Sequence, residues 1–252
     1  MGQKRDIGNL SFEQYHAYRT GKSWDASSFG VCDTIDARYF DVELARSGIR
    51  ATQGAAVLEI GFGNGQFAAW AAYRGLSYVG TELDDVLVEL ARGKGFEAFP
   101  ATLDLTRPTK GKKFNFIVAF DVLEHLSVEE IITLLRSASE CLVDGGSFLA
   151  RFPSGDSPFA RSIQYGDWTH RTTIGSGIVH QLAYAAGLDV AQIRSPAFPV
   201  FGLGLRRFCR RVPIVLIREF VSAIINVAFH DNQPKVITPN TLVVLRRPAR
   251  MP

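Results

Sequence analysis

The stretch VLEIGFGNGQF, residues 57–67, places three glycines at alternate positions directly after a short apolar run. Residues 55–60 have the composition of a buried parallel strand, and apolar residues recur at helical spacing from Gln66 onward. Gly61, Gly63 and Gly65 are therefore expected in a strand-to-helix turn. Glycines in such a turn let the backbone N–H groups at the start of a helix approach a ligand closely. The stretch predicts a binding site for a small polar ligand.

The spacing of these glycines argues against a nicotinamide-dependent dehydrogenase. That fingerprint has glycines at the first, third and sixth places of the turn, whereas here Gln66 occupies the sixth. Glu59 precedes the first glycine by two residues, and a carboxylate at the end of a strand suits a cationic ligand better than a pyrophosphate.

The composition of the chain sets limits on its partners. The 252 residues carry a net charge of +3 with a pI near 8.8, so the overall charge does not require a nucleic-acid partner. Cys32, Cys141 and Cys209 are widely spaced and form no metal-binding or disulfide pattern. The first residues lack the apolar core of a signal peptide, and no run of about eighteen uncharged apolar residues is present. We expect a cytoplasmic protein, with no nucleic acid bound and no membrane-spanning segment.

From residue 55 onward, apolar runs alternate with helical patterns. This alternation is typical of an α/β sheet that is mostly parallel and covered by helices on both faces. Seven strands are expected, at residues 55–60, 77–83, 96–103, 114–121, 147–153, 188–195 and 240–247. The helices between them begin near residue 66 and at residues 84, 127 and 176.

Two regions lie outside this alternation. Residues 1–50 are rich in aromatic side chains and are predicted to form a helical cap at one end of the sheet. Residues 196–239 form a helical insertion before the last strand that is much longer than an ordinary connection. The predicted organisation is therefore a cap (1–50), a core (51–195), an insertion (196–239) and a last strand with a tail (240–252).

Chemically informative residues recur where the predicted strands end, which is where open parallel sheets bind ligands. LEIGFGNG, the acidic Glu82 in YVGTELD, the Asp104-Leu105 pair, and FDVLEHL (120–126) followed by a helix and VDGGSFLARFP appear in that order. In this order the motifs resemble those of class I S-adenosylmethionine-dependent methyltransferases, which have a Rossmann-like fold. The resemblance covers residues 55 to about 195.

The resemblance implies a set of contacts with S-adenosylmethionine. The glycine turn would pass under the methionine part, Glu82 would hold the ribose, and Asp104 with the backbone of Leu105 would meet the adenine. A lone aspartate after a weak strand is also often a turn former, so this alternative stays open for Asp104. Asp121 is expected either near the methyl group or as a cap of the next segment. The expected cofactor-binding residues are Glu59, Gly61, Gly63, Gly65, Glu82, Leu83, Asp104, Leu105 and Asp121.

A narrower resemblance appears downstream. QYGDWTHRTTIGSGIVHQLAYAAGLDV (164–190) and TPNTLVVLRRP (238–248) are similar to segments of methyltransferases of bacterial surface polysaccharide and O-antigen biosynthesis. Those enzymes usually have Phe-Thr shortly after the TH pair, where this chain has Thr173-Ile174. Their fifth strand commonly ends in Pro-Asn, where this chain has RFPSG. These departures concern the acceptor more than the reaction.

Methyl transfer to a hydroxyl requires an aligned acceptor and removal of its proton. His170 is the first candidate for the general base, because histidine titrates near neutral pH, and Asp167 is its candidate orienting carboxylate or a substrate ligand. His125 is the second candidate, with packing beneath the cofactor as its alternative. No metal-ligand cluster is visible in the sequence, so we expect chemistry that does not depend on a metal.

Five residues are candidates for the acceptor site: Tyr165, Trp168, Arg171, Tyr15 and His16. Trp168 offers a flat face to a sugar ring, and Tyr15 and His16 could close the cap over the cofactor. Loop anchoring or core packing is the alternative for each. His180 and His230 lie in helical patterns and are interpreted as structural.

The insertion is open to several interpretations. Arg206, Arg207, Arg210 and Arg211 recur beside apolar residues, which suits a helix on an anionic membrane surface, a subunit interface or a substrate lid. The apolar segment that follows is interrupted by Arg218 and Glu219, which favours burial against the domain or a partner. Peripheral contact with the inner membrane and a homo-oligomer formed through residues 201–230 are both compatible with this pattern.

The sequence thus predicts a methyltransferase that acts on a sugar hydroxyl of a bacterial surface glycan or of its precursor. The first alternative is a methyltransferase of small molecules such as quinones or secondary metabolites. The second is a scaffold that binds the cofactor without catalysis in a biosynthetic complex.

Overall fold

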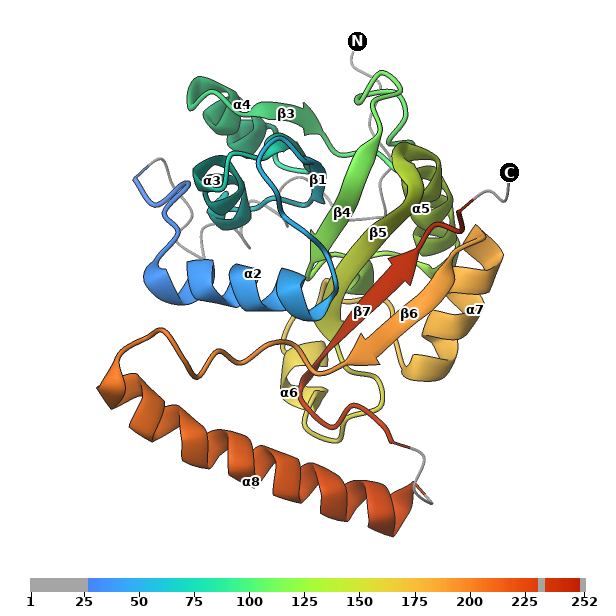
Figure 1. Cartoon of the computed structure of the whole chain (residues 1–252). Helices are drawn as coiled ribbons and strands as arrows, with labels where there is room; N and C mark the ends of the chain where they lie inside the picture. Colours follow the sequence, from blue (N-terminus) through green and yellow to red (C-terminus); the bar gives the residue numbers. More distant parts are fainter. Residues whose placement is uncertain (1–26, 231–233, 250–252) are drawn as a thin grey trace.

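The computed structural model describes residues 27–230 and 234–249 of the chain. Its centre is a seven-stranded sheet with the order β3-β2-β1-β4-β5-β7-β6 (Figure 1). The strands are β1 (Ala56–Ile60), β2 (Ser77–Glu82), β3 (Glu97–Pro100), β4 (Phe114–Phe120), β5 (Leu142–Pro153), β6 (Asp189–Arg194) and β7 (Asn240–Arg246). β7 lies antiparallel between β5 and β6, and the other neighbouring strands are parallel. The predicted fold, a mostly parallel α/β sheet, is confirmed.

Helices cover both faces of this sheet, as its apolar sequence requires. The α-helices are α2 (Thr34–Arg46), α3 (Gln66–Tyr73), α4 (Asp85–Gly93), α5 (Val128–Cys141), α6 (Arg161–Gln164), α7 (Ser176–Ala186) and α8 (Leu205–Phe229). A short 3-10 helix, η1 (Leu123–His125), follows β4. Figure 1 shows α2 and α3 on one side of the sheet and α5 and α7 on the other.

The two faces are packed by alternate residues of the same strands. Val57, Phe116 and Val118 contact the apolar residues of α2 and α3, whereas Leu58 and Ile117 contact those of α5 and α7. Successive side chains of a strand point to opposite faces, so strands buried on both sides must be apolar at every position. This explains why the predicted strands have continuous apolar runs rather than alternating ones.

Two strand boundaries differ from the prediction by more than one residue. β3 ends at Pro100 instead of residue 103, because its partner β2 ends at Glu82 and the last hydrogen bond between them runs from the N–H of Ala101 to the carbonyl oxygen of Glu82. β5 begins at Leu142, before the predicted start, and a register shift against β4 accommodates the segment that the sequence suggested as a turn.

The insertion forms one helix, α8, which runs through Pro213 and buries none of its residues. Of the two expected alternatives, burial of α8 within the domain does not occur among the residues that the structure describes, and burial against a partner stays a prediction. α8 is also long enough and apolar enough to cross a membrane, as judged by length and composition, which the interrupted sequence did not suggest.

A buried carboxylate attaches α2, which lies in the described part of the predicted cap, to the far edge of the sheet. Glu43 of α2 is fully buried, forms an ion pair with Arg194 at the end of β6, and accepts the backbone N–H of Ala197. This one side chain connects α2 with the first residues of the insertion.

We expect Glu43→Ala to lower the free energy of unfolding by about 3 kcal/mol, because it leaves the guanidinium of Arg194 without its carboxylate and the N–H of Ala197 without its acceptor. Urea denaturation measures the change. Glu97→Ala, which removes an exposed ion pair with Lys112, is the control and should cost less than about 1 kcal/mol. Equal effects of the two substitutions would contradict the role given to Glu43.

Candidate functional site

A cavity of about 390 Å³ opens at the carboxyl ends of β1, β2 and β4. This volume lies in the range of small-molecule sites. Seven of the residues expected at the site line it: Glu59, Gly61, Gly63, Glu82, Leu83, Asp121 and His125. The strand ends thus bring together residues that are far apart in the sequence.

The glycine turn and the end of β2 are joined by one carboxylate. Glu82 Oε2 accepts the N–H of Gly63 at 2.8 Å, and Oε1 accepts the N–H groups of Leu83 at 2.6 Å and Asp84 at 3.2 Å. Gly61 and Gly63 have φ angles of 69° and 51°, a region that favours glycine. The carboxylate is therefore held at the cavity wall by backbone donors, where a ligand's hydroxyl groups could reach it.

Glu59 lies deeper, on β1, with only 4% of its surface exposed. Its Oε2 accepts the hydroxyl of Tyr78 at 2.7 Å. Burial, together with repulsion from Glu82, raises the pKa of Glu59 to about 8, although the Tyr78 hydrogen bond opposes the shift. A positively charged ligand in this cavity would favour the ionised form of this carboxyl group.

The residues expected at the adenine, Asp104 and Leu105, form hydrogen bonds within the chain. Asp104 Oδ1 accepts the N–H and hydroxyl of Thr106, and the N–H of Leu105 donates to Ser137 at 2.8 Å. These bonds favour the turn-former alternative for Asp104, and neither Asp104 nor Leu105 is among the residues that line the cavity, so their contact with adenine stays a prediction. Because β3 ends early, the residues that line the cavity here are Ala101, Thr102 and Leu103.

Gly65 has a packing role. It is the N-cap of α3 with φ of 70°, and a Cβ atom there would lie 2.7 Å from the ring of Phe29. This glycine permits Phe29 to close over the turn, and it lies outside the residues that line the cavity.

Asp121 is held in a left-handed conformation, with φ of 57°, directly after β4. Its carboxylate forms a two-pronged ion pair with Arg151 of β5, whose guanidinium lies over the rings of Tyr39 and Phe120. Non-glycine residues adopt this backbone conformation only when surrounding contacts compensate for its cost. The Arg151 pair supplies such contacts and fixes one wall of the cavity.

The helical cap contributes to the same cavity. Asp36, Tyr39 and Phe40 of α2 line it beside residues of the core. Tyr15 and His16, which the sequence suggested for this wall, lie outside the described residues.

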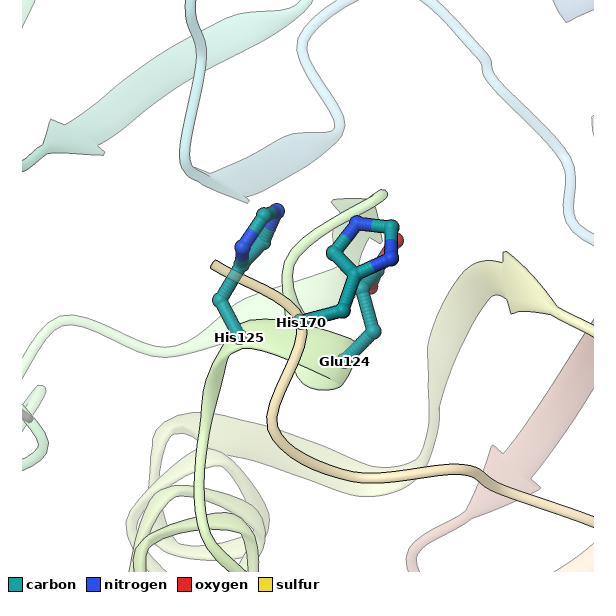
Figure 2. Close-up of side chains that lie close together, drawn as sticks. All are labelled: Glu124, His125 and His170. Carbon is teal, nitrogen blue, oxygen red and sulfur yellow. The ribbon is translucent and has the colours of Figure 1, made fainter. Parts of the chain in front are cut away.

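Two histidines from distant segments, His125 and His170, lie side by side (Figure 2). The rings of His125 on η1 and His170 pack edge to face with centroids 4.7 Å apart. His125 and Thr169 are among the residues that line the cavity. Burial, followed by repulsion from His170, lowers the pKa of His125 below its ordinary value.

The hydrogen bonds around these rings favour one arrangement of protons. Asp167 accepts the hydroxyl of Thr169 at 2.5 Å, and the Thr169 oxygen lies 2.9 Å from His125 Nδ1. His170 Nδ1 lies 3.1 Å from the carbonyl oxygen of Gln164. Both imidazoles can therefore donate from Nδ1 and keep a lone pair on Nε2. Asp167 supports His125 through Thr169, whereas the sequence suggested a direct partnership with His170.

The same cluster contains the buried carboxyl group of Glu124, which Figure 2 shows beside the two rings. One ligand-capable atom from each of Glu124, His125 and His170 lies within 4.8 Å of the others. Burial, followed by repulsion from Asp121, raises the pKa of Glu124 well above its ordinary value. By residue type, this set could serve in proton transfer or could bind a divalent cation.

The remaining acceptor candidates lie at the surface beside this cluster. Tyr165 and Trp168 have 72% and 73% of their surface exposed. Arg171 forms an ion pair with Glu130, which also caps the start of α5, so its side chain anchors the loop.

Sequence reasoning missed several residues of the cavity wall: Asp36, Tyr39, Phe40, Gln66, Phe67, Phe120 and Thr169. The signals were partly present, since Tyr39 and Phe40 lie in the aromatic-rich region of residues 1–50 and Thr169 lies in the YGDWTHR element. No sequence pattern indicates which face of α2 turns toward the sheet.

We expect Glu82→Gln to weaken binding of S-adenosylhomocysteine by about 10- to 100-fold, because the amide replaces an ionised acceptor. Isothermal titration calorimetry measures this change. Asp104→Asn is the matched control and should change affinity by less than about threefold, since its carboxylate serves a turn. A larger loss of affinity in Asp104→Asn than in Glu82→Gln would instead support a contact between Asp104 and the adenine.

Comparison with known proteins agrees with this geometry. Residues 34–193, more than half of the chain, match the family model of a methyltransferase domain. No curated protein matches the sequence.

Several solved structures have a similar fold. A SAM-dependent methyltransferase from Archaeoglobus fulgidus is 14% identical with a TM-score of 0.59, over 92% of this chain and 99% of that one. A protein from Galdieria sulphuraria described as a sarcosine dimethylglycine methyltransferase is 16% identical with a TM-score of 0.58, over 94% and 100% of the two chains. The mitomycin 7-O-methyltransferase MmcR is 16% identical with a TM-score of 0.57, over 93% of this chain and 57% of that one.

The order of the strands, the carboxylates around the glycine turn and the matching family model all lead to one assignment. The chain belongs to the methyltransferase domain family and is a class I methyltransferase whose cofactor is S-adenosylmethionine.

Proposed function

We propose that this enzyme methylates a sugar hydroxyl of a bacterial surface glycan or of its lipid- or nucleotide-linked precursor. The observation that carries the proposal is the exposed Trp168, which is followed directly by Thr169 at the cavity and by His170. A flat apolar ring at the edge of a site suits the C–H face of a sugar. The similarity of residues 164–190 and 238–248 to polysaccharide methyltransferases supports the same acceptor.

The cavity fits the cofactor by the chemistry of its wall. Glu82 would hold the ribose hydroxyls, residues 101–103 would flank the adenine, and Glu59 with the glycine turn would hold the charged methionine end. The bound cofactor supplies an electrophilic methyl group to an acceptor oxygen aligned opposite the leaving sulfur.

We propose His125 as the residue that takes the proton of the acceptor hydroxyl, with His170 at its edge. His125 lines the cavity, and its support by Thr169 leaves Nε2 as the basic nitrogen. Its lowered pKa keeps the ring neutral at pH 7. His170 is the second candidate in this proposal, whereas the sequence suggested it first.

The acceptor class is tested by transfer of a labelled methyl group from S-adenosylmethionine to candidate substrates. We expect transfer to lipid-linked oligosaccharide, nucleotide-sugar or polysaccharide fractions. Transfer to quinols or secondary metabolites alone would favour the small-molecule alternative, in keeping with the similarity to the mitomycin enzyme. A protein that binds the cofactor but methylates nothing in this panel would favour the scaffold.

Trp168→Ala should raise the KM for a glycan acceptor by about 10-fold, because the ring offers its face to the sugar and not to the cofactor. Affinity for S-adenosylhomocysteine should stay unchanged. Tyr184→Ala removes an equally exposed aromatic ring from α7 and is the control that should alter neither quantity. An unchanged KM in the Trp168 variant would remove the main support for a sugar acceptor.

The pH dependence of the reaction tests the general base. A neutral imidazole is required, so kcat/KM should rise with pH through a pKa below about 6.5 and then level off. His125→Ala should lower kcat by about 100-fold or more and remove this acidic limb.

Two controls accompany this measurement. His180→Ala, at an exposed position of α7, should leave the profile unchanged. A chelator should also leave turnover unchanged, because the proposal uses the imidazoles as bases and not as metal ligands. Loss of the acidic limb in His170→Ala but not in His125→Ala would transfer the role of base to His170, and inhibition by the chelator would indicate a metal at Glu124, His125 and His170.

A further inference from the structure

One face of α8 is apolar and exposed along the whole length of the helix. Leu205, Leu216, Ile217, Phe220, Ile224 and Val227 each expose between 51% and 77% of their surface. Residues 205, 209, 216, 220, 224 and 227 are separated by three, four or seven positions, the spacing that keeps side chains on one side of a helix. We call this set, including Cys209 and Ile217, the outer stripe.

Contacts with the domain fix which side of α8 faces outward. Arg211 and Arg218 lie over the ring of Phe198 at 4.0 and 4.5 Å, and the side chain of Asn226 accepts the N–H of Lys235 at 2.7 Å. Before the helix, Arg38 of α2 donates to the carbonyl oxygen of Phe201 at 3.1 Å. The helix therefore does not turn freely, and the outer stripe is directed away from the domain.

The charge of α8 is concentrated at its first two turns. Arg206, Arg207, Arg210 and Arg211 lie there, and Glu219 is the one acidic residue of the helix. Among the described residues, none of these arginines forms an ion pair with a carboxylate. Positive side chains are unfavourable at the positive end of a helix dipole. An external anionic surface next to this end would compensate for their placement.

The pairing of β6 with β7 limits how α8 can contact a membrane. β6 before the insertion and β7 after it are paired along their length, so both ends of α8 must return to the same side of a bilayer. The helix has 25 residues, so it is about 37 Å long. If it spanned a bilayer, the segment that leads to β7 would have to cross back as extended chain with unsatisfied peptide groups, which hydrocarbon does not tolerate. A helix of this kind can only lie flat in the interface.

We propose that α8 docks the enzyme on the surface of an anionic phospholipid bilayer, with the outer stripe in the acyl boundary and the arginines of the first turns at the headgroups. The apolar stripe lies beside a basic end that has no acidic partner among the residues that the structure describes. This favours lipid over a second copy, because parallel copies would bring the arginines of both helices together. The insertion that contains α8 leaves the sheet where β6 ends and rejoins it where β7 begins. The carboxyl end of β5 lies at this same end of the sheet (Figure 1). Docking there would bring the cavity near lipid-linked acceptors, although the proposal does not depend on the acceptor.

The test uses the full-length protein and co-sedimentation with vesicles. We expect binding to vesicles of phosphatidylcholine mixed with phosphatidylglycerol, and much weaker binding to phosphatidylcholine alone. Replacing three residues of the stripe (Leu216→Gln, Phe220→Gln and Val227→Gln) should weaken binding by at least about 100-fold. Replacing Arg206 and Arg210 by Gln should weaken it by about 5-fold for each arginine.

Matched controls separate docking from general surface effects. Tyr73→Gln, Val86→Gln and Tyr184→Gln together remove exposed apolar side chains elsewhere, and Arg50→Gln with Lys110→Gln removes exposed charges elsewhere. Neither control should change vesicle binding. Affinity for S-adenosylhomocysteine and the thermal midpoint of every variant show that the domain remains folded.

Cys209 provides a second readout within the stripe. In a Cys32→Ser background, the buried Cys141 leaves Cys209 as the exposed thiol among the described residues. An environment-sensitive fluorophore on Cys209 should shift to shorter wavelength with anionic vesicles. The proposal is overturned if the wild type does not bind anionic vesicles or if the stripe variant binds them as tightly as the wild type does. It is also overturned if the stripe variant only converts a dimer into monomers, which would make a second copy the occupant.

Discussion

The site depends on one carboxylate that several backbone N–H groups hold at the end of β2. Glu82 joins the glycine turn after β1 to the start of α4, so two loops that are independent in sequence become one wall. The turn must also admit Val122 and Phe29 close to the chain, where a Cβ atom on Gly61 or Gly65 would lie only 2.7 Å from them. Once this wall is fixed, the ends of β3 and β4 can complete the cavity around it.

Much of this arrangement could be predicted from the sequence, for a physical reason. In a parallel sheet, the carboxyl ends of neighbouring strands meet at one edge, so polar residues that follow apolar runs are close in space even when they are distant in sequence. Glu59, Glu82, Asp121 and His125 are of this kind. The predicted strands and the helices on both faces are confirmed because burial on both sides leaves a strong apolar signal.

Other features depended on contacts that no local pattern contains. Because β3 ends at Pro100, residues 101–103 line the cavity and Asp104 lies in a turn. Asp167 accepts the hydroxyl of Thr169, and the Thr169 oxygen lies against His125. The aspartate therefore supports a histidine of a distant segment and not His170, which is its neighbour in the sequence. The direction in which α8 presents its apolar residues follows from contacts with Phe198 and Lys235, which sequence periodicity cannot supply.

The protonation of Glu59 couples the binding of a positively charged ligand to the pH of the solution. Near neutral pH this carboxyl group is mostly protonated in the empty cavity, because burial raises its pKa to about 8 and Glu82 lies near it. A cation that enters the cavity stabilises the ionised form, and the displaced proton leaves to the buffer. Where Glu59 holds the positive end of the cofactor, as proposed, loading of the enzyme would exchange a proton for a positively charged molecule, and cofactor affinity would increase as the pH rises toward 8.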